Sequence, residues 1–273
     1  MPREVEPSQN ERDFIRQALR ESIRLDGRAL DDFRHLELSF GDEYGVADVR
    51  LGKTRVIARI SAEVTTPFPD RKFDGIFTIS SELSPMASPA FEVGRQTTAE
   101  TLLSRLLEKS IRRSGALDTE SLCIIAGSKC FSIRADIHIL SAHGNLIDAS
   151  CIALVAALQH FRRPDVLVEG EDVTVFSRAS ANPYYSSSST DPDAPPTILL
   201  DADLAEEAVA DGSVVVSMNR HGEVCQIAKY GGDAVDPVTL LNCTRVAAEK
   251  VKGLHGLVQK ALEQDEKRRD VGV

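Results

Sequence analysis

The chain has 273 residues, and its 42 acidic against 32 basic residues give a formal net charge of −10. This balance excludes a protein that grips nucleic acid over its whole surface, although it leaves room for a local basic groove. Hydrophobic residues at 42% and charged residues at 27% are ordinary globular values, which argue against a disordered chain. At about 150 residues per domain, the length predicts one large domain or two small ones.

The composition also bears on compartment and membrane contact. The longest apolar run, Cys151 to Leu158, is far shorter than the ~18 residues that cross a bilayer. The first ten residues are polar and partly acidic, which predicts neither a signal peptide nor a transit peptide. Five scattered cysteines without a CxxC pair favour a reducing compartment, with the thiols as small core residues.

The N-terminal part predicts one helix and three strands. Ser8 and Glu11 form a capping box that begins a helix over about 9–25. Its arginines repeat every four residues up to Arg24, which indicates a solvated face. Alternation over 46–51 and 56–62 predicts an antiparallel pair turning near Gly52-Lys53, followed by a strand over 75–83 and an irregular connection over 84–94.

The middle of the chain alternates helices and strands. Leucines at helical spacing predict a helix over 97–113, and a short apolar run predicts a strand over 122–126. The segment 129–140 alternates cleanly, with Phe131 to Ile139 facing inward at every second position. A helix rich in small residues is predicted over 147–161.

The C-terminal part is predicted to be strands and one long helix. A strand over 172–177 precedes a flexible loop, 179–196, that is rich in Ser, Asp and Pro. Strands are expected over 197–202, 213–219 and 223–229, the last two joined by a turn at 220–222, and Asp236-Pro237 begins the last helix. The pattern indicates an α+β domain whose helices cover mixed sheets.

Two groups of polar residues are candidates for chemistry. Asp201, Glu206 and Glu207 follow a strand, which suits either Mg²⁺ or acid-base work, or the N-terminus of a helix; the pattern favours the helix. His138 and His143 lack a nearby third ligand, so a structural or surface role is favoured over metal binding.

A basic strip lies at the end of the predicted helix over 97–113. Lys109, Arg112 and Arg113 are preceded in the chain by Arg95. Arginines on a helix beside a loop can hold phosphates, and they can equally form a solvated face. From the residue types alone, both interpretations stand.

Five motifs in order give the sequence a family resemblance: Arg24-Leu-Asp-Gly-Arg28, Gly52-Lys-Thr-Arg-Val56, Pro89-Ala-Phe-Glu-Val-Gly-Arg-Gln96, Asp118-Thr-Glu-Ser-Leu122, and Asp136-x-His138 with Gly144-Asn-Leu-Ile-Asp-Ala149. The chain resembles the RNase PH-like subunits of the RNA exosome. The resemblance implies an α+β RNase PH-like fold (ribosomal protein S5 domain 2-like). It implies a single domain over 1–273, with similar lobes at about 28–178 and 197–265 joined by the loop 179–196.

The resemblance also implies what the chain does not do. Active members of this family degrade RNA from its 3′ end by phosphorolysis, with a phosphate pocket at a helix N-terminus. Here that pocket reads His143-Gly-Asn-Leu-Ile147, and the side chains of Leu146 and Ile147 cannot hold phosphate. Asp201 and Glu207 match the family's two catalytic aspartates in spacing, but the second is Glu. We therefore expect no catalytic residues, no metal and no cofactor.

By the same resemblance, the chain is expected to work in an assembly. The family pairs active with inactive subunits, and the inactive partner lends basic residues to the RNA path, which favours RNA-binding roles for Arg95, Lys109, Arg112 and Arg113. Expected partners are RNase PH-like subunits in a hexameric ring, S1/KH cap subunits, catalytic exosome nucleases and single-stranded RNA, in the nucleus, nucleolus and cytoplasm. The alternatives are an active phosphate-dependent exoribonuclease using Asp201 and Glu207, and a free-standing RNA-binding scaffold.

Overall fold

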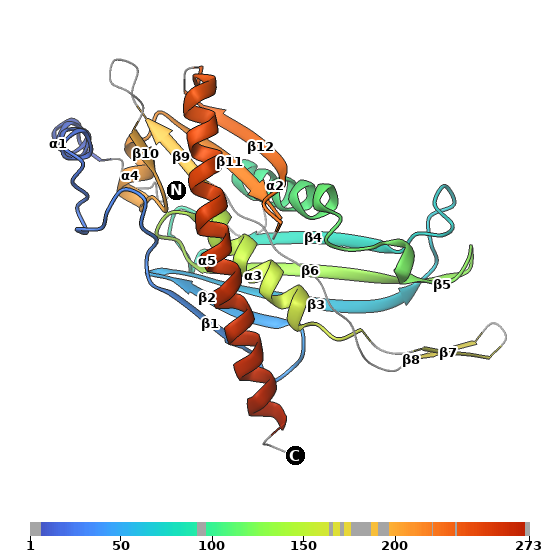
Figure 1. Ribbon diagram of the computed structural model, residues 1–273. Helices are drawn as coiled ribbons and strands as arrows, with labels where there is room; N and C mark the ends of the chain where they lie inside the picture. The colour runs from blue at the N-terminus through green and yellow to red at the C-terminus, as the bar shows by residue number, and fades with distance from the viewer. Residues whose placement is uncertain are drawn as a thin grey trace.

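The computed structural model describes residues 7–91, 97–163, 166–169, 172–175, 187–190, 197–219, 221–232 and 234–270. For residues 112, 113, 166–169, 172–175, 187–190 and 197 the description is confined to the backbone. Within these residues the chain forms two main sheets and several helices, with the longest helix running past both lobes (Figure 1).

A six-stranded mixed sheet forms the first lobe. Its strands lie in the order β1 (Leu36–Phe40), β2 (Val46–Leu51), β3 (Thr54–Thr65), β6 (Lys129–Ser141), β4 (Ile76–Leu83), and β5 (Cys123–Ile125) pairs with the beginning of β6. The β4 strand runs parallel to β6, and the other pairs are antiparallel. The predicted alternation of β6 is confirmed, because Phe131, Ile133, Ala135, Ile137 and Ile139 are all buried.

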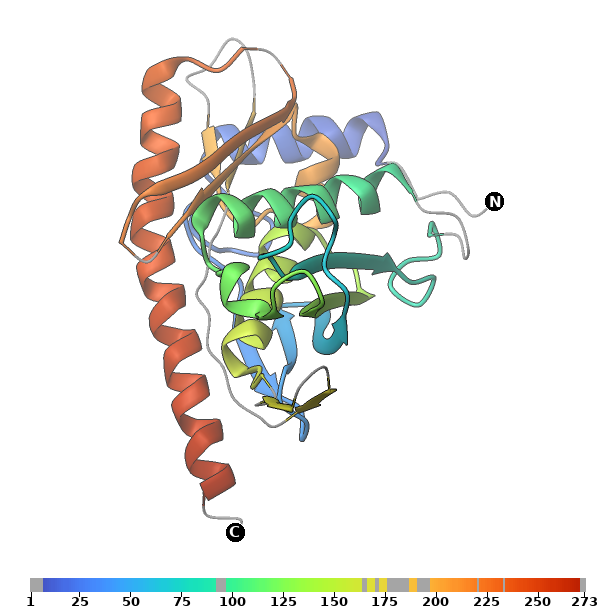
Figure 2. The ribbon, with the colours of Figure 1, turned by 90° about the vertical axis from the view of Figure 1, so that its right-hand side faces the viewer.

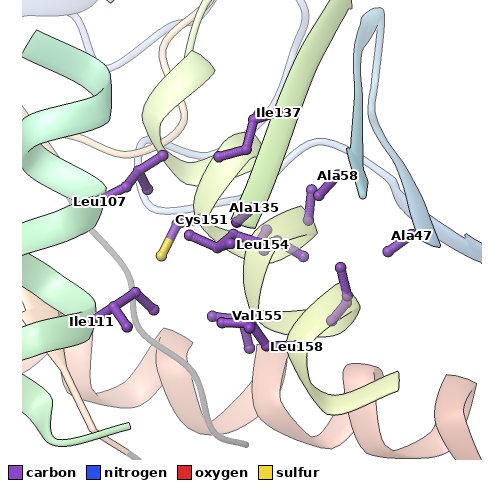
Figure 3. Packing of buried hydrophobic residues seen from close by; sticks show 14 of the residues in the cluster. Ala47, Ala58, Leu107, Ile111, Ala135, Ile137, Cys151, Leu154, Val155 and Leu158 are labelled. Carbon is purple, nitrogen blue, oxygen red and sulfur yellow. The ribbon is translucent and has the colours of Figure 1, made fainter. Parts of the chain in front are cut away.

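Helices α2 (Thr98–Ser114) and α3 (Leu146–His160) close the core of this lobe. From Asp148 to His160 every residue of α3 is buried, because this helix packs on β2 and β3 and is also contacted by α2 and α5. Leu107 and Ile111 of α2 point towards Cys151, Leu154 and Val155 of α3 (Figure 3). The small side chains of α3 permit this close packing, as the sequence predicts.

A four-stranded antiparallel sheet forms the second lobe. Its order is β10 (Thr197–Leu199), β9 (Ser187–Thr190), β11 (Gly212–Met218), β12 (Val224–Gly231). Helix α4 (Leu204–Val209) follows β10, and α5 (Pro237–Asp270) runs alongside both lobes as the red helix of Figure 2. One buried hydrophobic cluster contains residues of both main sheets and of α5.

Two of the secondary-structure predictions from the sequence are wrong. Helix α1 (Gln9–Arg20) stops before the expected end near Leu25, because Ser22 adopts a left-handed φ of 59° and the Ile23 amide bonds back to the Ala18 carbonyl. The segment 179–196 is not all loop, because β9 pairs on both sides with β10 and β11. Backbone pairing forms this strand despite its serine-rich composition; 179–186 and 191–196 lie outside the described residues.

Smaller features complete the fold. A 3₁₀ turn, η1 (Glu120–Leu122), precedes β5, and the hairpin of β7 (Val166–Glu169) and β8 (Asp172–Val175) follows α3. A second hydrophobic cluster joins Ile15 and Leu19 of α1 to Leu199, Ala202 and Val209. None of the helices in the described part is both long and apolar enough to span a bilayer.

Candidate functional site

Asp201 lies where β10 turns towards α4, and its carboxylate is saturated by protein donors. Its φ of 50° is left-handed, and its side chain has no exposed surface. One oxygen accepts from Arg34 Nη2 and Asn145 Nδ2, at 2.7 and 2.8 Å. The other accepts from Arg34 N, Arg34 Nε and Arg28 Nη1, at 2.7, 2.9 and 3.0 Å. Burial would raise the pKa of Asp201, but the hydrogen bonds from Arg34 and Asn145 outweigh it and hold the pKa below its usual value.

Arg24 makes a second buried ion pair beside the first. Its guanidinium donates to both Glu206 oxygens, at 2.9 and 2.6 Å, and to the Leu200 and Asp201 carbonyls, each at 2.9 Å. The Arg24 side chain has no exposed surface, so the prediction of a solvated arginine at this position is wrong. The helix ends four residues earlier, and the linker that follows turns Arg24 inward. This geometry explains why Arg24 and Arg28 belong to one motif: both bind the segment that carries Asp201.

The N-terminus of α3 is capped by groups of the protein itself. Gly144 and Asn145 both have left-handed φ angles, 81° and 52°. The Asn145 amide oxygen accepts from the Asp148 N–H at 3.4 Å, and its Nδ2 donates to the Asp148 carboxylate at 2.9 Å. The Asn145 N–H donates to Glu207 Oε1 at 2.6 Å. Where a helix N-terminus commonly receives an anion, this one therefore meets carboxylates of its own chain.

Glu206 and Glu207 lie in the first turn of α4. Asp203 and Glu206 form a reciprocal capping box, which confirms the interpretation of this acidic run as a helix N-terminus. Desolvation raises the pKa of Glu207 to about 7, and the charges of Asp148 and Asp201 act in the same direction. The residue nevertheless keeps an exposed surface. Asp201 and Glu207, predicted as a half-retained catalytic pair, do lie around the same helix end.

The described residues do not form a metal site. In the part of the chain that the structure describes, no group of three or more His, Cys, Asp or Glu residues is placed to hold a metal ion. His138 is half exposed beside Glu82, at 3.1 Å, and His143 is exposed. Both positions fit surface roles for these histidines.

A pocket of about 700 Å³ opens beside the Asp201 cluster. Arg34, Lys53 and His143 line it together with Asp26 and Asp203. Arg34, however, is also committed to Thr54 Oγ1 and to the carbonyls of His143 and Gly144, at 3.4, 2.7 and 3.1 Å. The Arg34 guanidinium therefore binds groups of the protein itself.

The basic strip predicted for RNA lies on α2. Lys109 is exposed, whereas the side chains of Arg112 and Arg113 and the whole of Arg95 lie outside the described residues. By helical spacing, positions 105, 109, 112 and 113 share one face of α2, opposite the buried Leu103 and Leu107. Arg105 is 70% exposed and pairs with Glu108 at 3.0 Å. It also lines a groove of about 850 Å³ with Arg71 and Arg134.

Sequence reasoning missed Arg34, which donates three hydrogen bonds to the Asp201 carboxylate and one each to Thr54, His143 and Gly144. One feature of the sequence could have indicated it. The segment 21–35 contains three arginines, and its hydrophobic residues show neither helical nor strand periodicity. Arginines in such a segment are candidates for long-range carboxylate pairing.

The fold and the site define a class of protein. Residues 32–164 match the model for the 3′ exoribonuclease family, domain 1, and residues 196–250 match the model for domain 2 of the same family. Because these matches cover more than half of the chain, it belongs to the 3′ exoribonuclease family.

Individual relatives narrow the class further. The chain is 45% identical to "Exosome complex component rrp45" of Schizosaccharomyces pombe, over 99% of this chain and 96% of the relative. It is 40% identical to "Exosome complex component RRP45" of Saccharomyces cerevisiae, over 99% and 95%. Among solved structures, it matches a chain of the Archaeoglobus fulgidus exosome with RNA bound to the active site, with a TM-score of 0.78, 28% identity and coverage of 90% and 96%.

Proposed function

We propose that this chain is a non-catalytic, structural subunit of the exosome core ring. In that ring it supports 3′-to-5′ processing and degradation of RNA, including rRNA maturation and the turnover of mRNA and non-coding RNA. The near-complete alignment with two exosome RRP45 components supports the placement in an exosome. The observation that carries the non-catalytic part is the saturation of Asp201 by Arg34, Arg28 and Asn145.

Two physical arguments support inactivity. Phosphorolysis needs inorganic phosphate next to the RNA backbone, but the N-terminus of α3 faces Asp148 and Glu207. An ionised carboxylate within about 4 Å of a phosphate charge adds roughly 1 kcal/mol of repulsion in water and about 4 kcal/mol at an effective dielectric constant near 20. Glu207, whose pKa is raised to about 7, adds this repulsion only in its ionised form. Releasing Asp201 for a metal ion would also strand Arg34 and Arg28 without their shared carboxylate, which is costly for buried groups.

The test of inactivity is a phosphorolysis assay on the full chain. With 3′-labelled and 5′-labelled RNA, Mg²⁺ and inorganic phosphate, we expect no release of nucleoside diphosphates above a phosphate-free control. Release that depends on phosphate, and that disappears in an Asp201→Asn variant, would instead establish the active exoribonuclease.

We also propose that the α2 face carrying Lys109, Arg112 and Arg113, with Arg95 nearby in sequence, contacts the RNA backbone. The exposure of Lys109 and the common face of the three α2 positions support this role. Contacts of this kind are sequence-independent and depend on salt, because binding releases counterions from the phosphates.

Neutralising that face gives a quantitative test. Replacing Lys109, Arg112 and Arg113 with Ala in the assembled ring should weaken RNA protection and lower the slope of log K against log salt by about 2, since each single-strand contact contributes roughly 0.7. The matched control replaces Lys252, Lys260 and Lys267, three exposed lysines of α5, with the same change in charge. If the two triple variants weaken RNA protection equally, the α2 face does not contribute specifically to the RNA path.

The proposed partners are other RNase PH-like subunits in a hexameric ring, S1/KH cap subunits and catalytic exosome nucleases, in the nucleus, nucleolus and cytoplasm. Affinity purification of the tagged chain, followed by identification of its partners and by gel filtration, tests this assembly. A chain that elutes alone under native conditions would favour the free-standing scaffold.

A further inference from the structure

Two free cysteines face each other across a pair of strands. Cys123 of β5 is the direct register partner of Cys130 of β6 in an antiparallel ladder, and neither forms a disulfide. Directly opposed residues in such a ladder have Cα atoms about 4.5 or 5.5 Å apart, depending on the hydrogen-bonding class of the pair, and their side chains share a face. A disulfide needs a Cα separation of about 4.4–6.8 Å. Either class of pair therefore places the two Cα atoms at a separation that a disulfide can span.

The two thiols differ in access. Cys130 has no exposed surface, whereas Cys123 is partly exposed. Burial raises the pKa of Cys130, and a negative charge on Cys123 acts in the same direction. An outer thiol open to solvent beside an inner protected one is the arrangement of an attacking and a resolving cysteine.

We propose that Cys123 and Cys130 form a redox-active dithiol that small-molecule disulfides oxidise reversibly to an intrachain disulfide. The Cys123 thiolate attacks one sulfur of a disulfide such as oxidised glutathione, whose S–S bond breaks and releases one glutathione thiolate. Cys130 then gives its proton to the released glutathione thiolate and attacks the Cys123 sulfur, and the second glutathione leaves as a thiolate. Two protein thiols are oxidised by two electrons, and one external disulfide is reduced to two thiols.

Oxidation would also change a contact of the hairpin with its neighbour. The Lys72 carbonyl accepts from the Gly127 N–H at 2.9 Å and from the Cys123 thiol at 3.9 Å. A disulfide removes the thiol donor and leaves the amide donor. Arg71 and Asp74, on either side of Lys72 in sequence, line the groove that Arg105 of α2 also lines, so the contact that oxidation changes lies next to one wall of that groove.

The direct test is equilibration of the full chain in glutathione buffers of graded redox ratio, followed by acid quenching, alkylation and peptide mass spectrometry. We expect a linked peptide pair, Cys123 to Cys130, that lacks two hydrogen atoms and returns to free thiols on reduction. Cys225, which is also partly exposed, serves as the internal control and should form no intrachain disulfide. A Cys123–glutathione adduct that persists beside a free Cys130 would overturn the proposal, as would two free thiols in the most oxidising buffer.

A second probe uses the reduced protein and needs no oxidant. Phenylarsine oxide bridges two neighbouring thiols in a complex that dithiols reverse and monothiols do not. The wild-type chain and a Cys225→Ser variant should both form this complex, and a Cys123→Ser variant should not. Unchanged binding in Cys123→Ser, with its fold verified by circular dichroism, would show that the two sulfur atoms do not act together.

Discussion

Removing the Arg24 guanidinium tests the buried network that positions Asp201. The change Arg24→Met keeps a long, apolar stem and deletes both hydrogen bonds to Glu206, at 2.9 and 2.6 Å, and the three to backbone carbonyls. Glu206 would remain in place, because it also accepts from the Asp203 N–H at 2.9 Å in the capping box of α4. The variant thus leaves a carboxylate with a 2% exposed side chain without the guanidinium that pairs with it.

The size of the effect follows from that geometry. Breaking a buried pair from one side costs about 3–5 kcal/mol, because the remaining charge stays desolvated. Set against a total stability of roughly 5–15 kcal/mol, Arg24→Met should remove a large part of the folding free energy. Neutralising both partners removes the stranded charge, so Arg24→Met with Glu206→Gln should be more stable than the sum of the single losses predicts, by roughly 1–3 kcal/mol.

Urea unfolding of the wild type, the two single variants and the double variant measures this coupling. The midpoints give the stability differences if the slopes agree. A loss below about 1 kcal/mol for Arg24→Met, well under the range for a buried pair, would refute the reasoning. Strict additivity in the cycle would also refute it, since uncoupled residues cannot form the ion pair described.

Further predictions concern the same region. Asp201→Asn should be less stable than the wild type at neutral pH, and the gap should narrow as pH falls below about 4. The reason is that a carboxylate with a lowered folded-state pKa stabilises above its unfolded pKa and loses that contribution as it protonates. A stability difference between the wild type and Asp201→Asn that stays constant as pH falls would contradict this. Gly144→Ala should destabilise by more than about 1 kcal/mol, because φ is left-handed there. Its new Cβ would also lie 2.6 Å from the Asp203 carbonyl carbon. An unchanged melting temperature would contradict it.

Regular elements were predictable wherever burial imposes a period. The inward residues of β6 alternate without interruption, because one face of the sheet is covered, and this pattern can be read directly. Strand β9 carries no such signal: its Ser and Thr residues pair through the backbone between β10 and β11. The end of α1 was missed for a related reason. The left-handed turn that ends the helix occurs at Ser22, and serine, unlike glycine, does not indicate such a turn in a sequence.

Of the candidate site, only the acidic residues could be predicted from the sequence. The acidic run at 201–207 was identified because it follows a predicted strand, and the family resemblance paired Asp201 with Glu207. The groups that bind the Asp201 carboxylate, however, come from positions up to 173 residues away in sequence. Arg28 and Arg34 lie in a linker without period, so nothing local indicates their partner. Long-range ion pairing is decided by the tertiary fold, so the sequence could not predict that Arg28, Arg34 and Asn145 bind the Asp201 carboxylate.

The Asp201 contacts also join the two lobes, in addition to the hydrophobic cluster that both lobes share. Arg24, Arg28 and Arg34 come from the linker before β1, Asn145 begins α3 of the first lobe, and Asp201 follows β10 of the second. Both Asp201 oxygens are needed for these contacts, so the same atoms cannot serve a metal ion without breaking the joint. The contacts that support the proposed loss of catalysis are therefore contacts that join the lobes. A substitution that freed Asp201 for chemistry would be expected to loosen the subunit first.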